Sequence, residues 1–484
     1  MRLRPPLLTA DDARVRAGLD RLRAELEVPD GFPADALATA ERAAATPPEA
    51  LPEGVPGPRV DRTDVELVTV DPEGSTDLDQ ALAVTAREGG GFRVAYAIAD
   101  LALFVPPAGP LDAEVHRRGV THYAPDGRSP LHPDPIGTGA ASLLPDGVRP
   151  AVLWTVDLDP EGAAVATTVE RAVVRSRRQL SYEQAQALID GGDPPLALSA
   201  LRQVGELRLA QERARGGISL THPQQEVVPR DGGYALRYAA PLAVEDWNAQ
   251  ISLLCGIEAA RIMLDGGVGL LRTLPDPEPR ALERLRRSAA ALGVDWPAGR
   301  SYPEFVRGLD PATAVGGALL TQCARTLRGA GYTAFDGSPP AVPGHAAIAA
   351  PYAHVTAPIR RLADRVANEA LLAQAAGRPV PPWVRAGLTP AAEAMAASGR
   401  RAGALERGAI DLVEALLLAD RVGEAFTGVV VDVDDRGALV QLRDPAVQGR
   451  ATGDGLELGR ELRVTVAEAD PERRVVRFAA AGPG

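Results

Sequence analysis

The chain has 484 residues, of which 45% are hydrophobic and 24% are charged, and its formal net charge is −12. This length exceeds what one hydrophobic core usually serves, so we expect two or three domains of ordinary soluble composition. No apolar run reaches the roughly 20 residues that cross a bilayer, which excludes a membrane-spanning protein.

The cysteines and the basic residues restrict the cellular compartment and the kinds of partner that we expect. Two isolated cysteines, Cys255 and Cys323, exclude a disulfide framework and a cysteine zinc site. The chain starts without an apolar leader, so we expect a cytoplasmic protein. All 52 basic residues are arginine, and arginine suits bidentate contact with phosphate. The negative net charge of the chain therefore argues against general adhesion to nucleic acid, but not against a local groove lined by arginine.

Residues 1–58 are predicted to form a small helical N-terminal domain. Apolar positions at helical spacing predict a helix over 11–26, and a second helix follows a Pro/Gly break, over 34–45. The two helices fit a helix-turn-helix and a helical packing arm equally well. A Pro/Gly-rich linker over 47–58 ends this region.

Residues 59–420 mix strands with helices, which predicts an α+β catalytic domain. Alternating apolar residues predict strands over 65–70, 81–84, 92–99 and 151–156. Helical spacing predicts helices over 181–188, 197–213, 244–265, 279–292, 358–376 and 390–419.

Residues 421–484 change character again. Short alternating runs separated by turns, starting at residues 426, 437, 461 and 474, predict a five-stranded barrel of the OB type. Such barrels often bind single-stranded nucleic acid, although only Phe426 and Phe478 supply aromatic rings here. The expected architecture is thus α+β and multidomain.

A loop between two predicted strands carries four acidic residues, Asp71, Glu73, Asp77 and Asp79. Carboxylates this close repel one another unless a cation or a shared proton compensates. Magnesium takes such oxygen ligands together with substrate phosphate oxygens. A solvated acidic turn is the plain alternative. A calcium loop of the EF-hand type fails, because Leu82 occupies the twelfth position.

A second motif runs from Tyr352 to Asp364 and contains Arg360 and Arg361. Pro358 suits the first turn of a helix, which places both arginines near a helix N-terminus. Helix-end amides and a guanidinium together favour a phosphate group. The alternative is an ion pair of Arg360 with Asp364 on one helix face.

Taken together, these motifs resemble the ribonuclease II (RNB) family. The resemblance rests on residues 70–82, residues 97–100 and residues 352–361, in that order along the chain, and covers roughly residues 60–420. It implies processive 3′→5′ hydrolysis of single-stranded RNA with a free 3′ end, releasing nucleoside 5′-monophosphates. The terminal barrel resembles the RNA-binding barrel of that family, and we expect a monomer.

The resemblance also implies roles for individual residues. Asp71, Asp77 and Asp79 match aspartates around one or two Mg²⁺ ions, for which Mn²⁺ can substitute, and Gln80 stands beside them. Asp79 and Arg360 are the expected catalytic residues. Expected RNA contacts are Tyr123, which matches an aromatic that stacks on the 3′-terminal nucleotide, with Tyr352, Thr356, Arg360 and Arg361.

Gln80 departs from the family pattern, which has a fourth aspartate at this position. An amide oxygen can bind Mg²⁺ but brings no charge, so we expect a weaker second metal site, with Glu73 or a water molecule compensating. The N-terminal region is also too short for the paired cold-shock barrels of ribonuclease II. Two other functions stay open: a catalytically weakened RNB-fold RNA-binding protein, and a structural calcium-binding protein.

Overall fold

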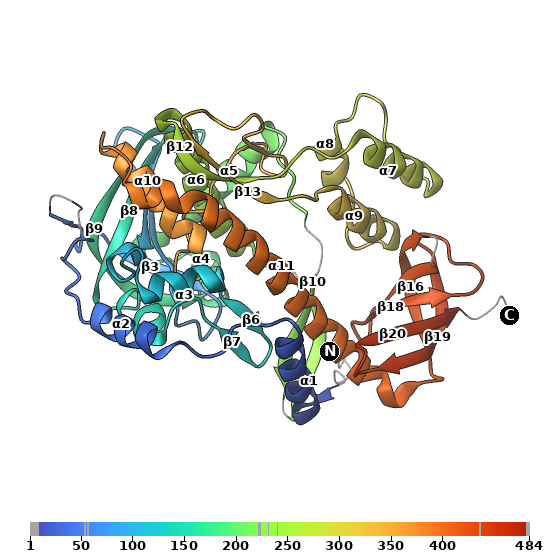
Figure 1. Ribbon diagram of the computed structural model, residues 1–484. Coiled ribbons are helices and arrows are strands. Elements are labelled where there is room, and N and C mark those ends of the chain that lie inside the picture. The colour runs from blue at the N-terminus through green and yellow to red at the C-terminus, as the bar shows by residue number, and fades with distance from the viewer. Residues whose placement is uncertain are drawn as a thin grey trace.

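The computed structural model describes residues 9–52, 55, 58–220, 224–230, 232–239, 241–434 and 437–480. Figure 1 shows a large lobe built around a sheet and a smaller barrel, with the long helix α11 (Pro382–Leu418) running from one to the other. Within these ranges, no helix combines the length and the apolar character that crossing a membrane would require.

The large lobe is organised by a six-stranded sheet. Its strands are β2 (Val60–Asp61), β3 (Leu67–Asp71), β4 (Gln80–Ala86), β5 (Phe92–Ala99), β8 (Val148–Leu158) and β9 (Ala164–Ser181). They follow the order β2-β9-β3-β4-β5-β8, and β9 also pairs with β8, so the sheet curls back on itself. The four predicted strands are confirmed. Strand β9 was not predicted, because charged residues such as Glu170 and Arg175 interrupt its apolar alternation.

Helices and smaller strand pairs surround this sheet. The helices are α2 (Ala34–Ala44), α3 (Pro110–Arg118), α4 (Tyr182–Asp190), α5 (Leu201–Ala214), α6 (Ala243–Gly266) and α10 (Leu362–Ala375). The strand pairs are β6–β7 (His122–Ala124 and Gly127–Ser129), β12–β13 (Val268–Thr273 and Gly331–Asp336) and β14–β15 (Gly344–His345 and Ala350–Pro351). One core unites the sheet with buried residues of α6 and α10, among them Leu82, Tyr96, Ile251 and Val366.

Two helix boundaries differ from the prediction. Helix α10 begins at Leu362 and not at Pro358, because Arg361 is extended (φ −139°, ψ 123°) and forms a β-bridge with Val120. Helix α11 begins at Pro382 and contains Pro390 in its interior, where the sequence predicted its start. Proline removes one backbone donor from a helix interior, but Leu388 before Pro390 and Ala391 after it are both buried against the core.

The two N-terminal helices pack on different cores. Helix α1 (Asp12–Glu25) lies along α11, and its Val15, Leu19 and Leu22 belong to the core that α11 shares with the barrel. Helix α2 instead adds Ala36 and Ala40 to the core of the large lobe. The described residues of 1–58 therefore share no core of their own. Division of the chain at residues 58 and 420 stays a prediction.

The C-terminal strands form the expected closed barrel, in the order β16-β17-β18-β20-β19. They are β16 (Ala425–Asp434), β17 (Gly437–Leu442), β18 (Gln448–Thr452), β19 (Glu461–Asp470) and β20 (Val475–Ala480). A short sheet beside α11 contains β1 (Ala10–Asp11), β11 (Gly233–Ala239) and β10 (Gln224–Arg230). Helices α7 (Pro279–Ala291), α8 (Tyr302–Arg307) and α9 (Ala314–Thr326) have a separate small core above the barrel (Figure 1).

Candidate active site

The acidic loop joins two neighbouring strands of the curled sheet. Asp71 is the last residue of β3, and Gln80 is the first residue of β4. Leu78 fixes the loop between them: its side chain is fully buried, and its backbone N–H donates to Ser142 Oγ (3.0 Å). The Ser142 hydroxyl in turn donates to the Thr76 carbonyl (2.7 Å). The carboxyl groups of Asp77 and Asp79 are therefore held on either side of a buried anchor.

Asp79 connects the acidic loop to the arginine motif. Its buried carboxylate accepts a hydrogen bond from Ile359 N at Oδ1 (2.7 Å) and one from Arg360 Nε at Oδ2 (3.3 Å). Burial raises the pKa of Asp79 to about 7, although the Arg360 charge and the Ile359 amide lower it. The structure thus brings together the two residues that the sequence analysis assigned to catalysis.

The alternative pair of Arg360 with Asp364 does not form. Asp364 instead pairs with Arg361, whose Nη2 lies 2.8 Å from Asp364 Oδ2. The same oxygen accepts a hydrogen bond from Ala357 N (2.7 Å). Arg361 and Asp364 therefore brace the loop from the inside, while the Arg360 side chain stays 45% exposed.

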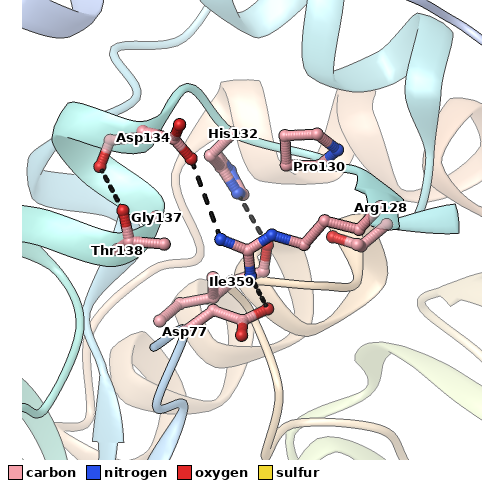
Figure 2. Close-up of a pocket in the computed structure, with 9 residues that line it drawn as sticks. Asp77, Arg128, Pro130, His132, Asp134, Gly137, Thr138 and Ile359 are labelled. Atoms are coloured by element: carbon pink, nitrogen blue, oxygen red, sulfur yellow. Dashed lines mark hydrogen bonds and ion pairs between the residues drawn. The ribbon is translucent and has the colours of Figure 1, made fainter. Parts of the chain in front are cut away.

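Asp77 is held by a hairpin that the sequence analysis did not connect to it. Strands β6 and β7 place Tyr123 opposite Arg128. The Tyr123 hydroxyl donates to Asp77 Oδ2 (3.0 Å), and Arg128 Nη1 lies 2.7 Å from the same oxygen. Figure 2 shows Arg128 between Asp77 and Asp134, beside a small pocket that also touches His132 and Ile359. The Tyr123 side chain is half exposed, which leaves its ring available for stacking.

Asp71 offers an oxygen that no other described group satisfies. Its Oδ2 is buried without a hydrogen-bond partner within the described ranges. Burial raises the pKa of Asp71 to about 6; the Arg360 charge lowers it, and the Asp77 charge raises it. An unsatisfied buried oxygen of this kind suits a bound cation.

The acidic side chains of the site do not converge on one point in this structure. Across the described part of the chain, no group of three or more His, Cys, Asp or Glu side chains is placed to hold a metal ion. Asp77 and Asp79 are each turned toward a guanidinium instead. Glu73, expected to compensate for Gln80, is exposed on the loop. The donor chemistry of Asp71, Asp77 and Asp79 fits a hard divalent cation, with Asp71 the least engaged of the three.

Both polar atoms of the Gln80 amide form hydrogen bonds within the protein. Its Nε2 donates to the Thr356 carbonyl (2.6 Å), and its Oε1 accepts from the Tyr96 hydroxyl (2.8 Å). Tyr96 is fully buried in the core of the large lobe. Gln80 therefore links β4 and β5 to the arginine motif, an arrangement that favours a positioning role over metal binding.

Three expected RNA contacts are engaged by other groups of the protein. Thr356 is buried, with its hydroxyl bonded to Ser252 Oγ (2.8 Å). Tyr352 is also buried, with its ring edge-on to those of His345 and His354. Arg361 is occupied by Asp364. Arg360 and Tyr123 are thus the exposed members of the expected set, and the other three support them.

Two protein-family models match parts of this chain. Residues 59–376 match the model of the RNB domain. The chain belongs to the RNB family. Residues 424–481 match the RNase II-type exonuclease C-terminal S1 domain, which coincides with the closed barrel.

Relatives of this RNB protein carry different descriptions. Ribonuclease R of Escherichia coli K12 is 28% identical over 430 residues, which cover 83% of this chain and 52% of that protein. The chain thus spans about half the length of that relative. An Arabidopsis thaliana protein named inactive exonuclease DIS3L2 is 30% identical over 363 residues, covering 67% of this chain and 34% of its own length.

The fold is shared with a solved structure, Mycoplasma genitalium RNase R in complex with ribose-methylated single-stranded RNA. The TM-score is 0.85 at 19% identity, covering 97% of this chain and 78% of that chain. At this identity the likeness concerns the fold alone. The N-terminal helices α1 and α2 of this chain do not form a cold-shock barrel.

Several residues that shape the RNB site escaped the sequence analysis. His132 is buried, and burial lowers its pKa to about 4, so the neutral ring donates from Nδ1 to the Ile359 carbonyl (2.9 Å). Asp100 ends the motif at residues 97–100 and accepts a hydrogen bond from Arg59 Nη1 (2.8 Å). It also pairs with Arg171, and Arg171 in turn pairs with Glu369 of α10. Only Asp100 carried a sequence signal, because the others lie outside the motifs.

Proposed function

We propose that this chain is a processive 3′→5′ exoribonuclease that hydrolyses single-stranded RNA to nucleoside 5′-monophosphates with Mg²⁺. The observation that carries the proposal is the Asp79 carboxylate, which Ile359 N and Arg360 Nε hold. The charge of the same arginine acts on Asp71, whose Oδ2 has no partner among the described residues. Carboxylates on one loop, one of them paired with a partly exposed guanidinium, suit the cleavage of a phosphodiester. Membership of the RNB family and the RNase II-type barrel support the same reaction.

The side chains of this site divide the work of binding and orientation. Arg360 is anchored to Asp79 through Nε, and its exposed end can donate to the non-bridging oxygens of the scissile phosphate. Such a donor, fixed in advance, stabilises the charge that develops during cleavage. Tyr123 can stack on the terminal base, worth about 1–3 kcal/mol whatever the base. The site therefore binds RNA without reading its sequence.

Asp71, Asp77 and Asp79 are the residues that would hold the divalent cation. Once bound there, Mg²⁺ or Mn²⁺ would polarise the phosphate and lower the pKa of a water molecule. The role of the protein is to fix these carboxylates, Asp77 through the β6–β7 hairpin and Asp79 through the arginine motif.

A labelled-RNA assay tests the proposal. The purified chain is incubated with the same oligoribonucleotide labelled at either its 3′ or its 5′ end, with Mg²⁺ or with EDTA. We expect Mg²⁺-dependent release of labelled mononucleotide from the 3′ label at the earliest times, and no release by an Asp79→Asn variant. RNA that is bound but not degraded would refute the proposal.

A catalytically weakened RNA-binding protein is the second candidate. The observation that favours it is Gln80, which adds no charge to the site and whose amide is already engaged at both ends. The relative named inactive exonuclease DIS3L2 supports the loss of activity that this candidate requires. The same assay separates the two, because this candidate predicts a stable complex with the 3′-labelled RNA and no mononucleotide.

A further inference from the structure

Arg128 and Tyr123 act on one oxygen of one aspartate. They are paired residues on the β6–β7 hairpin, and their side chains reach the same Asp77 Oδ2, at 2.7 Å for Arg128 Nη1 and 3.0 Å for the Tyr123 hydroxyl. Two donors on Oδ2 fix the orientation of the carboxylate. Asp77 Oδ1 is then the oxygen left for a ligand.

Asp77 is the closer of the two ion-pair partners of Arg128. Its side chain is 23% exposed and that of Asp77 is 13% exposed, so water screens the pair only in part. Its second acidic neighbour, Asp134, is 3.8 Å from Nη2, and the Asp134 side chain is 75% exposed. Figure 2 shows the guanidinium lying between these two carboxylates, with Asp77 at its closer end.

Like Arg128, Gln80 makes the site less negative than it would be with a carboxylate at residue 80. A carboxylate at this position would add a negative charge, whereas the amide is neutral and is bonded to Thr356 O and the Tyr96 hydroxyl. Relative to a site with a carboxylate at residue 80 and no cation at residue 128, the two residues together add two positive charges. That is the charge of one divalent cation.

The formal charge of the three loop aspartates together with Arg128 and Arg360 leads to the same number of cations. When ionised, Asp71, Asp77 and Asp79 together with Arg128 and Arg360 leave a formal charge of about −1. One divalent cation and the single negative charge of a phosphodiester bring this to zero. A second divalent cation would leave about two positive charges uncompensated in a partly buried site, which is costly.

We propose that Arg128 takes the place of a second divalent cation, so that this centre binds one divalent cation per chain. Arg128 is a positioning residue in this arrangement, since it acts on the site through Asp77. The inference rests on the proposed metal-dependent activity for its context. It concerns the number of bound ions, which can be measured without any hydrolysis.

The test counts Mn²⁺ ions bound to the full chain, by equilibrium dialysis and by electron paramagnetic resonance. Each measurement is made with and without a 2′-O-methyl oligoribonucleotide, which occupies the site without being cleaved. We expect one ion per wild-type chain under both conditions. We expect two ions in the double variant Arg128→Met/Gln80→Asp, which removes the guanidinium and supplies a carboxylate.

Two single variants control for folding and for general charge. Arg128→Lys keeps a cation beside Asp77 and should still bind one ion. Arg93→Met removes a guanidinium that pairs with Asp157 at a similar 2.7 Å, on the far part of β5, and should also bind one ion. Circular dichroism and the melting temperature show whether each variant is folded. If the double variant does not fold, Arg128→Met alone is counted, with a second, weaker ion expected.

The outcomes separate this inference from the proposed function. Two ions in the wild type, no ion in the wild type, or no added ion in the folded variant lacking Arg128 would each overturn the inference. One ion in a chain that degrades no RNA would leave the inference standing and refute the proposed function. One ion in a chain that releases mononucleotides supports both.

Discussion

Asp79 and Arg360 are separated by 281 positions in the sequence, yet the Arg360 Nε donates to Asp79 Oδ2 at 3.3 Å. The arginine is thereby oriented by a residue of the acidic loop, and its remaining donors extend toward solvent. The position of Arg360 thus depends on the folding of the acidic loop and of the arginine motif against each other.

The first prediction concerns this guanidinium. Replacing Arg360 by Gln should lower kcat by about 10²–10³-fold, the usual cost of losing one fixed donor to developing negative charge. The fold should persist, because Ile359 N still donates to the buried Asp79 carboxylate. Single-turnover cleavage of 3′-labelled RNA measures the effect. The matched control is Arg93→Gln, which removes an exposed arginine of β5. Equal rates for the two variants would contradict the assigned role.

The second prediction separates the ring of Tyr123 from its hydroxyl. Tyr123→Ala removes the stacking surface and should weaken RNA binding by about 1–3 kcal/mol, which is roughly 5- to 150-fold in KM. Tyr123→Phe keeps the ring but loses the hydrogen bond to Asp77, so it should lower kcat with little change in KM. Steady-state kinetics on an oligoribonucleotide measure both. A higher KM for Phe than for Ala would disprove this division.

The third prediction tests Gln80 as a structural link. Gln80→Met matches the length of the side chain but leaves the Thr356 carbonyl and the Tyr96 hydroxyl without their partner. An unsatisfied buried polar group costs about 1–3 kcal/mol, so the free energy of unfolding should fall by that order. Urea unfolding measures it. Gln211→Met removes a surface amide that also donates to a backbone carbonyl, and should cost less. No difference between the two would argue against the link.

The sequence could predict the parts of this site that are set by local patterns of apolar and polar residues. Alternating apolar residues predicted β3, β4 and β5, and thus placed the acidic loop between two strands. In the structure these strands are buried on both faces along most of their length. Nothing local joined Arg360 to Asp79; the family resemblance did so, and the fold confirmed that they meet. The start of α10 was wrong because the extended Arg361 is fixed by a tertiary bridge to Val120.

Two other features of the site also depend on tertiary contacts. Arg128 lies in a three-residue strand outside the motifs, and only the hairpin register brings it onto Asp77. Gln80 was expected near the metal because it stands where the family pattern has a fourth aspartate, and its binding to a metal stays a prediction. As the first residue of β4 it is reached by Tyr96 from the adjacent β5, so its amide is engaged within the protein. Long-range pairing of this kind leaves no periodic signal in a single sequence.

The last prediction concerns Glu414, at the junction of α11 with the barrel. Its buried Oε1 accepts hydrogen bonds from Gln448 N of β18 and from Gln225 Nε2 of β10, both at 2.6 Å. Burial nevertheless raises the pKa of Glu414 to about 8, well above its ordinary value of 4.5. In the pH range between these values the folded state holds a proton that the unfolded chain releases. Stability should therefore fall as the pH rises from about 4.5 to about 8, and this contribution should level off above that.

Unfolding measured from pH 5 to pH 9 checks this expectation. The slope due to Glu414 should reach at most about 1.4 kcal/mol per pH unit. Glu414→Gln keeps an acceptor for both hydrogen bonds but cannot ionise, so its stability should vary less with pH, and it should exceed the wild type most at pH 8–9. Glu457→Gln changes a glutamate whose side chain is 77% exposed, and should follow the wild-type curve. Parallel curves for the wild type and Glu414→Gln would mean that Glu414 ionises in the folded protein as readily as in the unfolded chain, and that its burial at the barrel junction does not couple stability to pH.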